Sequence, residues 1–259
     1  MSEYIQFEEK EGVGIIRLNR PDKYNSFVRE MALAFQKYMD YCADNDLIRA
    51  VLVTGNGKAF CAGQDLAEAI DPDGPELSKI VSEHYNPIIL RIRELKKPVV
   101  AAVNGVAAGA GANIALACDI TLAAKSSAFI QAFSKIGLIP DSGGTYYLPR
   151  IIGMQKASAL MMLGDKVMAD DAEKMGMIYK AIEDNELENE AFGMARKLAK
   201  MPTLGLALTK QALNSSFVNN LEEQLDLEDT LQTVAGNSYD YQEGVNAFLE
   251  KRKPEFKGK

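Results

Sequence analysis

The sequence predicts an α/β fold built on a largely parallel β-sheet that helices cover on both faces. Three short apolar runs rich in β-branched residues have the composition of buried strands: "RAVLVTG" (49–55), "KPVVAAVNG" (97–105) and "CDITLAA" (118–124). Helical patterns lie between these runs, as the crossover connections of parallel strands require. With 259 residues, 47% of them hydrophobic, the chain has enough apolar sequence for a sizeable core.

A β-hairpin is predicted at the start, because apolar residues alternate over 5–7 and again from 13, with a turn near Gly12. After a turn at a proline, a helix is predicted over about 27–45, with Asn25–Ser26 as its cap. One face of this helix is apolar, because hydrophobic residues recur at spacings of three and four: Met31, Phe35, Met39 and Cys42.

The longest apolar run, "VVAAVNGVAAGAGANIALA" (99–117), is predicted to be a buried strand, a glycine-rich turn and a buried helix. Asn104 and Asn113 interrupt it, so a membrane span is not expected. Beyond about Ile182 the pattern is helical to the end, and no Pro/Gly/Ser-rich linker precedes it. We expect this part to dock on the body of the protein or on a neighbouring subunit.

Charge and cysteine usage exclude several classes of protein. The net charge is −7 and the pI is near 5.0, so the basic surface of a nucleic-acid-binding protein is not expected. Three scattered cysteines and a single histidine, His84, form no disulfide or metal-ligand pattern, so no metal site is predicted. The first residues, "MSEYIQFEEKEG", lack the basic and apolar regions of a secretory signal, and a cytoplasmic location is expected.

Asp141 is the candidate catalytic carboxylate. It lies in "GLIPDSGGT" (137–145), between Pro140 and two glycines, with apolar residues on both sides. Aspartate is a good helix cap, and "DSGGT" could open a helix, although Pro149 is expected to limit that helix to a short turn. A carboxylate in an apolar pocket instead has a raised pKa and can act as a general base. The spacing leaves both roles open.

Two glycine-rich loops, "GNGKAFCAGQDL" (55–66) and "NGVAAGAGANI" (104–114), directly follow predicted strands. Ligands of α/β proteins bind where such loops leave the sheet. One backbone N–H from each loop could form an oxyanion hole; alternatively, the glycines only allow close packing. Neither loop has the spacing of a P-loop or a dinucleotide-binding fingerprint, and the single histidine disfavours a hydrolase triad at Ser142.

Together these residues resemble the enoyl-CoA hydratase/isomerase (crotonase) superfamily. The similarity covers nearly the whole chain in the family's order, through "NRPDKYNSF", "FCAGQDL", "KPVVAAVNGVAAGAGANIALACDI", "FSKIGLIPDSGGTYYLPRIIG" and "FLEKRKPEF". The resemblance implies a crotonase-like ββα spiral over residues 1–195 and a C-terminal helical trimerisation region over 196–259. It also implies a homotrimer or homohexamer that uses no cofactor beyond the coenzyme A of its substrate.

The resemblance further implies a site for an acyl-CoA thioester, whose enolate is held by two backbone N–H groups. On the matching positions, the catalytic residues are Asp141 and the N–H donors Ala62 and Ala110. Main chain around Lys58, Phe60, Ala62 and Gln64 is expected to line the adenine end, with Lys23 near the phosphates. The substrate-binding residues so implied are Lys23, Lys58, Phe60, Gln64, Asp65, Leu66, Gly109, Asn113 and Phe133.

Two departures from the family pattern indicate isomerisation. Where hydratases carry two glutamates, this chain has Asn113 and Phe133, so the carboxylate pair that activates water is missing. The hydratase "PG" is replaced by Pro140–Asp141, as in members that shift double bonds, and the surrounding sequence is most similar to the ring-epoxide isomerases of phenylacetate breakdown. We therefore expect an acyl-CoA isomerase. A hydratase, a dienoyl-CoA isomerase and a non-catalytic acyl-CoA-binding subunit are the alternatives.

Overall fold

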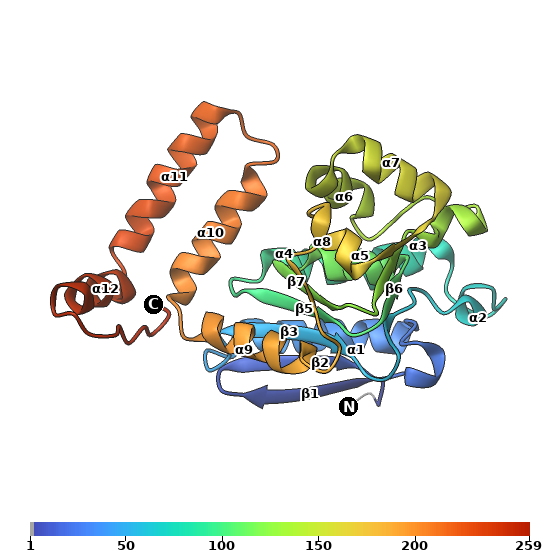
Figure 1. The fold of residues 1–259 in the computed structure, drawn as a ribbon, viewed down its shortest axis with the longest axis horizontal. Helices are drawn as coiled ribbons and strands as arrows, with labels where there is room; N and C mark the ends of the chain where they lie inside the picture. Colours follow the sequence, from blue (N-terminus) through green and yellow to red (C-terminus); the bar gives the residue numbers. More distant parts are fainter. Residues whose placement is uncertain (1–2) are drawn as a thin grey trace.

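The computed structural model describes residues 3–259, which form two β-sheets covered by helices (Figure 1). The larger sheet has six strands in the order β1-β2-β3-β5-β7-β10; the β1–β2 hairpin is antiparallel and the other neighbours are parallel. The predicted α/β class, the hairpin and the three buried strands are confirmed. The strands are Ile5–Lys10 (β1), Val13–Leu18 (β2), Ala50–Gly55 (β3), Val99–Val103 (β5), Ile120–Ala124 (β7) and Lys180–Ile182 (β10).

The second sheet has four short strands in the order β4-β6-β8-β9, and its β8–β9 pair is antiparallel. Each of β3, β5 and β7 is followed by a strand of this second sheet and then by helices, before the chain returns to the first sheet. This repeat is the expected ββα spiral, and it sets the loops after β4 and β6 side by side. The strands are Ala59–Cys61 (β4), Val106–Ala108 (β6), Ala128–Ile130 (β8) and Lys166–Met168 (β9).

Both faces of the six-stranded sheet are buried. Along β3, Val51 and Val53 belong to the core shared with α1, α4 and α5, whereas Ala50 and Leu52 belong to the core beneath α9. Alternate residues of a strand point to opposite faces, so burial on both sides explains why the run is apolar throughout. These helices are Arg29–Asp44 (α1), Asn86–Glu94 (α4), Ala110–Ala117 (α5) and Leu187–Ala199 (α9).

The start of α1 differs from the prediction. The helix begins at Arg29, and the pair Asn25–Ser26 does not cap it. Asn25 is buried and donates to the carbonyl oxygens of Asn56 and Ala59, at 2.9 and 2.8 Å. The cap comes instead from the distant Glu68, whose Oε1 accepts from the Arg29 N–H at 2.9 Å. A carboxylate is favourable there because a helix N-terminus carries partial positive charge.

The prediction that Pro149 limits its helix to a short turn was wrong. Helix α6 runs over Gly144–Ile152 with the proline inside it. Burial of Leu148 and Ile152 on either side of the proline offsets the loss of one backbone donor. The other helices before α9 are α2 (Leu66–Ala69), α3 (Leu77–Lys79), a π-helix (Ile80–Tyr85), α7 (Met154–Leu163) and α8 (Ala169–Lys174), with 3-10 turns at Pro21–Lys23 and Ala132–Ile136.

The C-terminal helices α10 (Thr203–Ser215) and α11 (Leu221–Gly236) pack on each other and project from the sheets, with α12 (Tyr239–Leu249) near their base (Figure 1). The predicted boundary after residue 195 lies inside α9, which packs on the sheet on both sides of that point through Ala195 and Ala199.

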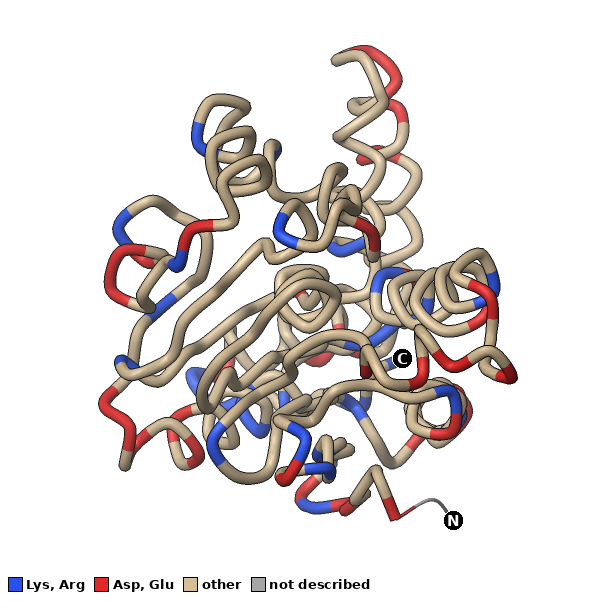
Figure 2. Tube along the Cα trace, turned by 90° about the vertical axis from the view of Figure 1, so that its right-hand side faces the viewer, with Lys and Arg blue, Asp and Glu red and all other residues tan. Residues whose placement is uncertain are grey.

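Lys and Arg lie among Asp and Glu over most of the trace, rather than gathered into one stripe (Figure 2). Helix α11 is strongly acidic and has no Lys or Arg. Within residues 3–259, no helix is both long and apolar enough to cross a membrane. The acidic residues of α11 are Glu222, Glu223, Asp226, Glu228 and Asp229.

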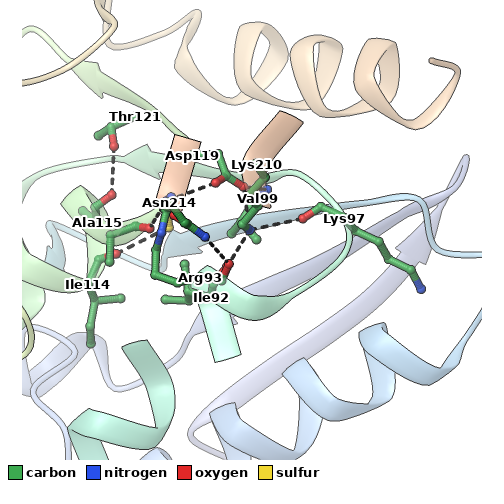
Figure 3. Close-up of polar contacts among 12 residues, drawn as sticks. Ile92, Arg93, Lys97, Val99, Ile114, Ala115, Asp119, Thr121, Lys210 and Asn214 are labelled. Atoms are coloured by element: carbon green, nitrogen blue, oxygen red, sulfur yellow. Dashed lines mark hydrogen bonds and ion pairs between the residues drawn. The ribbon is translucent and has the colours of Figure 1, made fainter. Parts of the chain in front are cut away.

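A buried ionic network joins α10 to the core (Figure 3). Lys210 of α10 donates to Asp119 Oδ2 at 2.8 Å and to the carbonyl oxygen of Ile92 at 2.6 Å. Arg93 of α4 donates to the other carboxylate oxygen of Asp119 at 3.1 Å. Burial lowers the pKa of Lys210, and the Asp119 charge opposes this shift by favouring the ammonium form. One carboxylate thus compensates two cations at the base of α10.

We predict that Asp119→Ala destabilises the protein by about 3–5 kcal/mol, because it leaves Lys210 buried without its carboxylate partner. Urea unfolding at fixed protein concentration measures the change. The matched control is Asp40→Ala, which breaks the more exposed pair with Arg91 and is expected to cost at most about 1 kcal/mol. Equal losses in the two variants would show that the network does not hold α10 in place.

Candidate active site

The two glycine-rich loops meet at the end of the second sheet. Each contains a short strand, β4 or β6, and these two strands are parallel neighbours, so the segments that follow them lie together. Gly63 has φ +90°, and a Cβ there would lie 3.0 Å from the Ala108 carbonyl oxygen and 3.5 Å from the Ala110 nitrogen. A Cβ on Gly111 would lie 2.3 Å from the Cys61 carbonyl oxygen. The glycines therefore do allow close packing, and this packing also brings the main chain of residue 63 up to the first N–H of α5.

Ala62, predicted as one of the two N–H donors, is not available. Its N–H donates to the carbonyl oxygen of Tyr24 at 2.9 Å. Two residues on, the N–H of Gln64 has no hydrogen-bond acceptor anywhere in the described chain, residues 3–259. Ala110 is the first residue of α5, where N–H groups have no acceptor within the helix. The available pair is therefore Gln64 and Ala110, which corrects the first position and keeps the second.

Asp141 is mostly buried just before α6, and its side chain does not cap that helix. The N-cap position is Gly143, without a side-chain hydrogen bond. The backbone carbonyl of Asp141 accepts from the Gly144 N–H at 2.9 Å, while its carboxylate accepts from the Ser142 hydroxyl at 2.7 Å. Burial raises the pKa of Asp141, and the Ser142 hydrogen bond partly opposes that shift. Of the two roles left open by the sequence, this geometry favours the general base.

Asn113 positions Asp141 instead of contacting a ligand, which corrects its prediction as a substrate-binding residue. Its side chain is 2% exposed, and both amide atoms are used. Nδ2 donates to the Asp141 carbonyl oxygen at 2.8 Å, and Oδ1 accepts from Gln131 Nε2 at 2.8 Å. A Cβ on Gly144 would lie 2.4 Å from Asn113 Nδ2, so glycine is required at that position.

Phe133 provides an apolar wall beside the start of α5. A Cβ built on Gly109 would contact the Phe133 ring at 3.7 Å, so the ring lies against this glycine. Gly109 has φ +53°, and its own N–H donates to the Ile130 carbonyl oxygen at 2.9 Å. Phe133 thus lies against the residue that directly precedes Ala110.

Three of the predicted substrate-binding residues act within the first loop itself. Phe60 is fully buried in the core, so its side chain is not available to a ligand. Asp65 accepts from the Ala67 N–H at 3.0 Å, capping α2, and pairs with Arg20 at 3.0 Å. Burial alone would raise the pKa of Asp65, but these hydrogen bonds hold it below its usual range. Leu66 is exposed at the start of α2.

Lys23, predicted near the phosphates, and Lys58, predicted at the adenine end, are exposed on adjoining segments. Lys23 ends a 3-10 turn, and Lys58 lies just before β4. A Cβ on Gly57 would lie 2.9 Å from Pro21 Cβ, so the segments that carry the two lysines pack together. Both ammonium groups are free to meet a phosphate in solution. Among residues 3–259, no group of three or more His, Cys, Asp or Glu side chains is placed to hold a metal ion.

Sequence reasoning missed Tyr85, Gln131 and Ser142. Tyr85 is fully buried, and its hydroxyl donates to Gln64 Oε1 at 3.0 Å. Burial raises its pKa well above the usual value, and the nearby charge of Asp141 contributes. Its stretch, "SEHYNP", has no motif that indicates such a role. His84, predicted to be a packing or surface residue, is fully buried.

Comparison with known proteins agrees with the fold and identifies the family. The enoyl-CoA hydratase/isomerase family matches residues 8–259, and the chain belongs to this family. It is 49% identical over 262 residues to the 1,2-epoxyphenylacetyl-CoA isomerase of Escherichia coli, with 100% of both chains covered. It is 35% identical to the trans-2-decenoyl-[acyl-carrier-protein] isomerase of Streptococcus mutans, with 98% of both covered. The crystal structure of an enoyl-CoA hydratase from Bacillus anthracis is similar at TM-score 0.92 and 31% identity, covering 99% of this chain and 100% of that one.

We predict that Asp141 titrates above the ordinary aspartate range and that Ser142→Ala raises its pKa further, because the hydroxyl hydrogen bond favours the charged form. Titration of ¹³C-labelled aspartates by NMR measures this, with Asp141→Asn identifying the resonance. Ser216→Ala, on an exposed helix end, is the control and should leave the titration unchanged. A midpoint at or below the ordinary range would show that the carboxylate is solvated.

Proposed function

We propose that this protein is an acyl-CoA isomerase that acts on 1,2-epoxyphenylacetyl-CoA in phenylacetate catabolism and also moves double bonds in enoyl-CoA esters. The observation that carries this proposal is the pair of free N–H groups, Gln64 and Ala110, together with a half-buried Asp141 of raised pKa. The 49% identity to an isomerase named for that substrate supports the choice of acyl group.

The proposed mechanism uses one base. The thioester carbonyl accepts hydrogen bonds from the N–H groups of Gln64 and Ala110, which strengthen as negative charge develops on the oxygen. Asp141 removes a proton from the acyl chain and returns it to another carbon. Its raised pKa suits both steps, because the group must be ionised to accept the proton and acidic enough to give it back.

Isomerisation by this route consumes nothing besides the substrate. In the double-bond shift one C–H bond breaks, another forms, and the electron pair moves through the enolate. In the epoxide reaction the ring carbon–oxygen skeleton rearranges to an isomer of the same composition. Neither reaction transfers electrons to an external acceptor, so the proposal requires no redox cofactor and no metal.

Several features disfavour water addition at this site. A hydratase of this family uses two glutamates, and the corresponding side chains here are an amide and a phenyl ring. Asn113 uses both of its amide atoms within the protein, and Phe133 is almost fully buried against Gly109. Neither side chain can activate water or deliver a proton to the substrate. The hydratase alternative therefore lacks its acid–base pair.

We also propose that the protein is a homotrimer or homohexamer in the cytoplasm. Support for assembly comes from α10, α11 and α12, which expose large apolar side chains that a soluble protein usually covers. The groove between α10 and α11 is lined mainly by apolar residues of both helices, including Leu206, Leu208, Ala212, Leu213, Leu225 and Leu231.

We predict that Asp141→Asn lowers the rate of double-bond migration in a 3-enoyl-CoA by roughly 10²–10⁴-fold, because the amide cannot accept the proton. Product formation and deuterium uptake from D₂O are followed by mass spectrometry, and binding of the ester by calorimetry. Binding should persist, and Asp46→Asn, an exposed carboxylate between α1 and β3, serves as the control. Near-wild-type turnover in Asp141→Asn would contradict the mechanism; ester binding without any exchange in the wild type would support a non-catalytic subunit.

In H₂¹⁸O, we predict that the wild-type protein isomerises enoyl-CoA without adding ¹⁸O to the product. Hydration of crotonyl-CoA should be slower than isomerisation by at least about 10²-fold, the typical contribution of one general acid or base. Mass spectrometry of the CoA esters measures both reactions in one sample. Incorporation of ¹⁸O at a rate close to isomerisation would favour the hydratase reading.

A further inference from the structure

The side-chain amide of Gln64 is held on both sides by protein groups. Tyr85 donates its hydroxyl proton to Gln64 Oε1 at 3.0 Å. Gln64 Nε2 donates to Glu68 Oε2 at 2.8 Å, and the other oxygen of Glu68 accepts from the Arg29 N–H at 2.9 Å. Donors and acceptors match along the whole chain, because a phenol donates, an amide does both and a carboxylate accepts. The orientation of the Gln64 amide is thereby fixed.

The main chain of Gln64 is held by the same part of the core. The Phe27 N–H donates to the Gly63 carbonyl oxygen at 2.7 Å, and the Asp65 N–H donates to the Phe27 carbonyl oxygen at 2.8 Å. These two bonds flank Gln64 and leave its own N–H unused. The ring of Phe27 lies 6.0 Å from that of Tyr85, in a tilted contact. Phe27 and Tyr85 therefore hold the main chain and the side chain of Gln64, respectively.

Tyr85 and Glu68, which hold the two ends of the Gln64 side-chain amide, form what we call the Gln64 clamp. Each end of this clamp is anchored on a helix. Tyr85 is fully buried at the end of the π-helix Ile80–Tyr85, and such wider turns occur frequently at functional sites. Glu68 is anchored at the N-terminus of α1, where the partial positive charge of a 16-residue helix favours a carboxylate. The clamp thus joins the second-sheet loop to two helices of the core.

Tyr85 also lies within the electrostatic field of Asp141. The burial of Tyr85 and the neighbouring negative charges keep its phenol protonated, so it stays a hydrogen-bond donor at any working pH. The group that orients Gln64 therefore does not itself exchange protons.

We propose that Tyr85 and Glu68 are positioning residues that aim the Gln64 N–H at the thioester oxygen through the Gln64 side chain. This inference rests on the proposed function, because it concerns the oxyanion donor of the same site. Stabilisation of a developing oxyanion depends on donors that are fixed before the reaction. Release of the Gln64 amide would let residues 63–65 move and weaken that bond more in the transition state than in the bound substrate.

The primary test is Tyr85→Phe, which removes only the hydroxyl that holds Gln64. We expect kcat to fall by about 10–100-fold, part of the effect of losing an oxyanion-hole donor, while KM changes by less than about 3-fold. A second readout is the near-ultraviolet absorbance of the enolate of a bound 3-ketoacyl-CoA, whose acidic C2 proton is lost to the buffer, so the signal reports the oxyanion site without requiring turnover. The enolate signal at fixed pH should decrease in Tyr85→Phe and persist in Tyr179→Phe, the exposed control.

Glu68→Ala tests the other side of the clamp on a short surface helix, so the proposal stays testable if Tyr85→Phe does not fold. It should lower kcat and the enolate signal in the same direction. The double variant should lose less than the sum of the two single losses in free energy, because both act through one amide. If both single variants keep the wild-type kcat and enolate signal, Tyr85 and Glu68 are not positioning residues, whatever the thermal stability of the variants.

The two proposals fail in different ways. If Asp141→Asn abolishes proton exchange while Tyr85→Phe and Glu68→Ala behave as wild type, the isomerase mechanism stands and the positioning role falls. If Asp141→Asn retains full activity, the one-base mechanism falls, and the enolate signal of Tyr85→Phe still decides the positioning role. A parallel rise of KM with unchanged kcat would also contradict the clamp, because it would indicate general loss of substrate binding.

Discussion

The close approach of two main-chain segments, the loop after β4 and the start of α5, is the constraint on which the site depends. Parallel pairing of β4 with β6 brings them together, and Gly63 and Gly111 leave no Cβ between them. At this distance no side chain can lie between the loops. The packing role of the glycines and the proposed oxyanion site are thus consequences of the same contact.

Asn113 occupies a position at which hydratases of this family keep a glutamate, and here its side chain supports the loop that carries Asp141. Asn113 sits on the first turns of α5, but its amide holds the backbone of Asp141 and is itself held by Gln131. In the proposed mechanism, the acid–base group is therefore carried by the loop before α6 instead of by α5. Phe133 lines the same region with apolar surface, and burial raises the pKa of Asp141 accordingly.

Residues distant in the sequence cap a helix and compensate a buried charge in this protein. Glu68 caps α1 from 39 residues away, and Asp119 compensates Lys210 across 91 residues. Asn25 and Pro149 misled the local prediction for the same reason: Asn25 satisfies buried carbonyl oxygens instead of a helix end, and burial of Leu148 and Ile152 outweighs the proline. Cap and breaker rules describe an isolated segment, and tertiary packing overrides them.

The sequence by itself determined the α/β class and the places of the main strands, because hydrophobic periodicity is a local property. The ββα repeat and Asp141 as the candidate catalytic carboxylate came from the resemblance to the family, since the spacing alone left Asp141 open as a cap or a base. Only the tertiary structure decided which N–H groups are free. Ala62 and Gln64 are two residues apart in one loop. The Tyr24 carbonyl oxygen accepts a hydrogen bond from the N–H of Ala62 and not from that of Gln64. No local pattern encodes that choice, because it depends on how the turn at Tyr24 packs against the loop. The contact between Tyr85 and Gln64 likewise depends on tertiary packing.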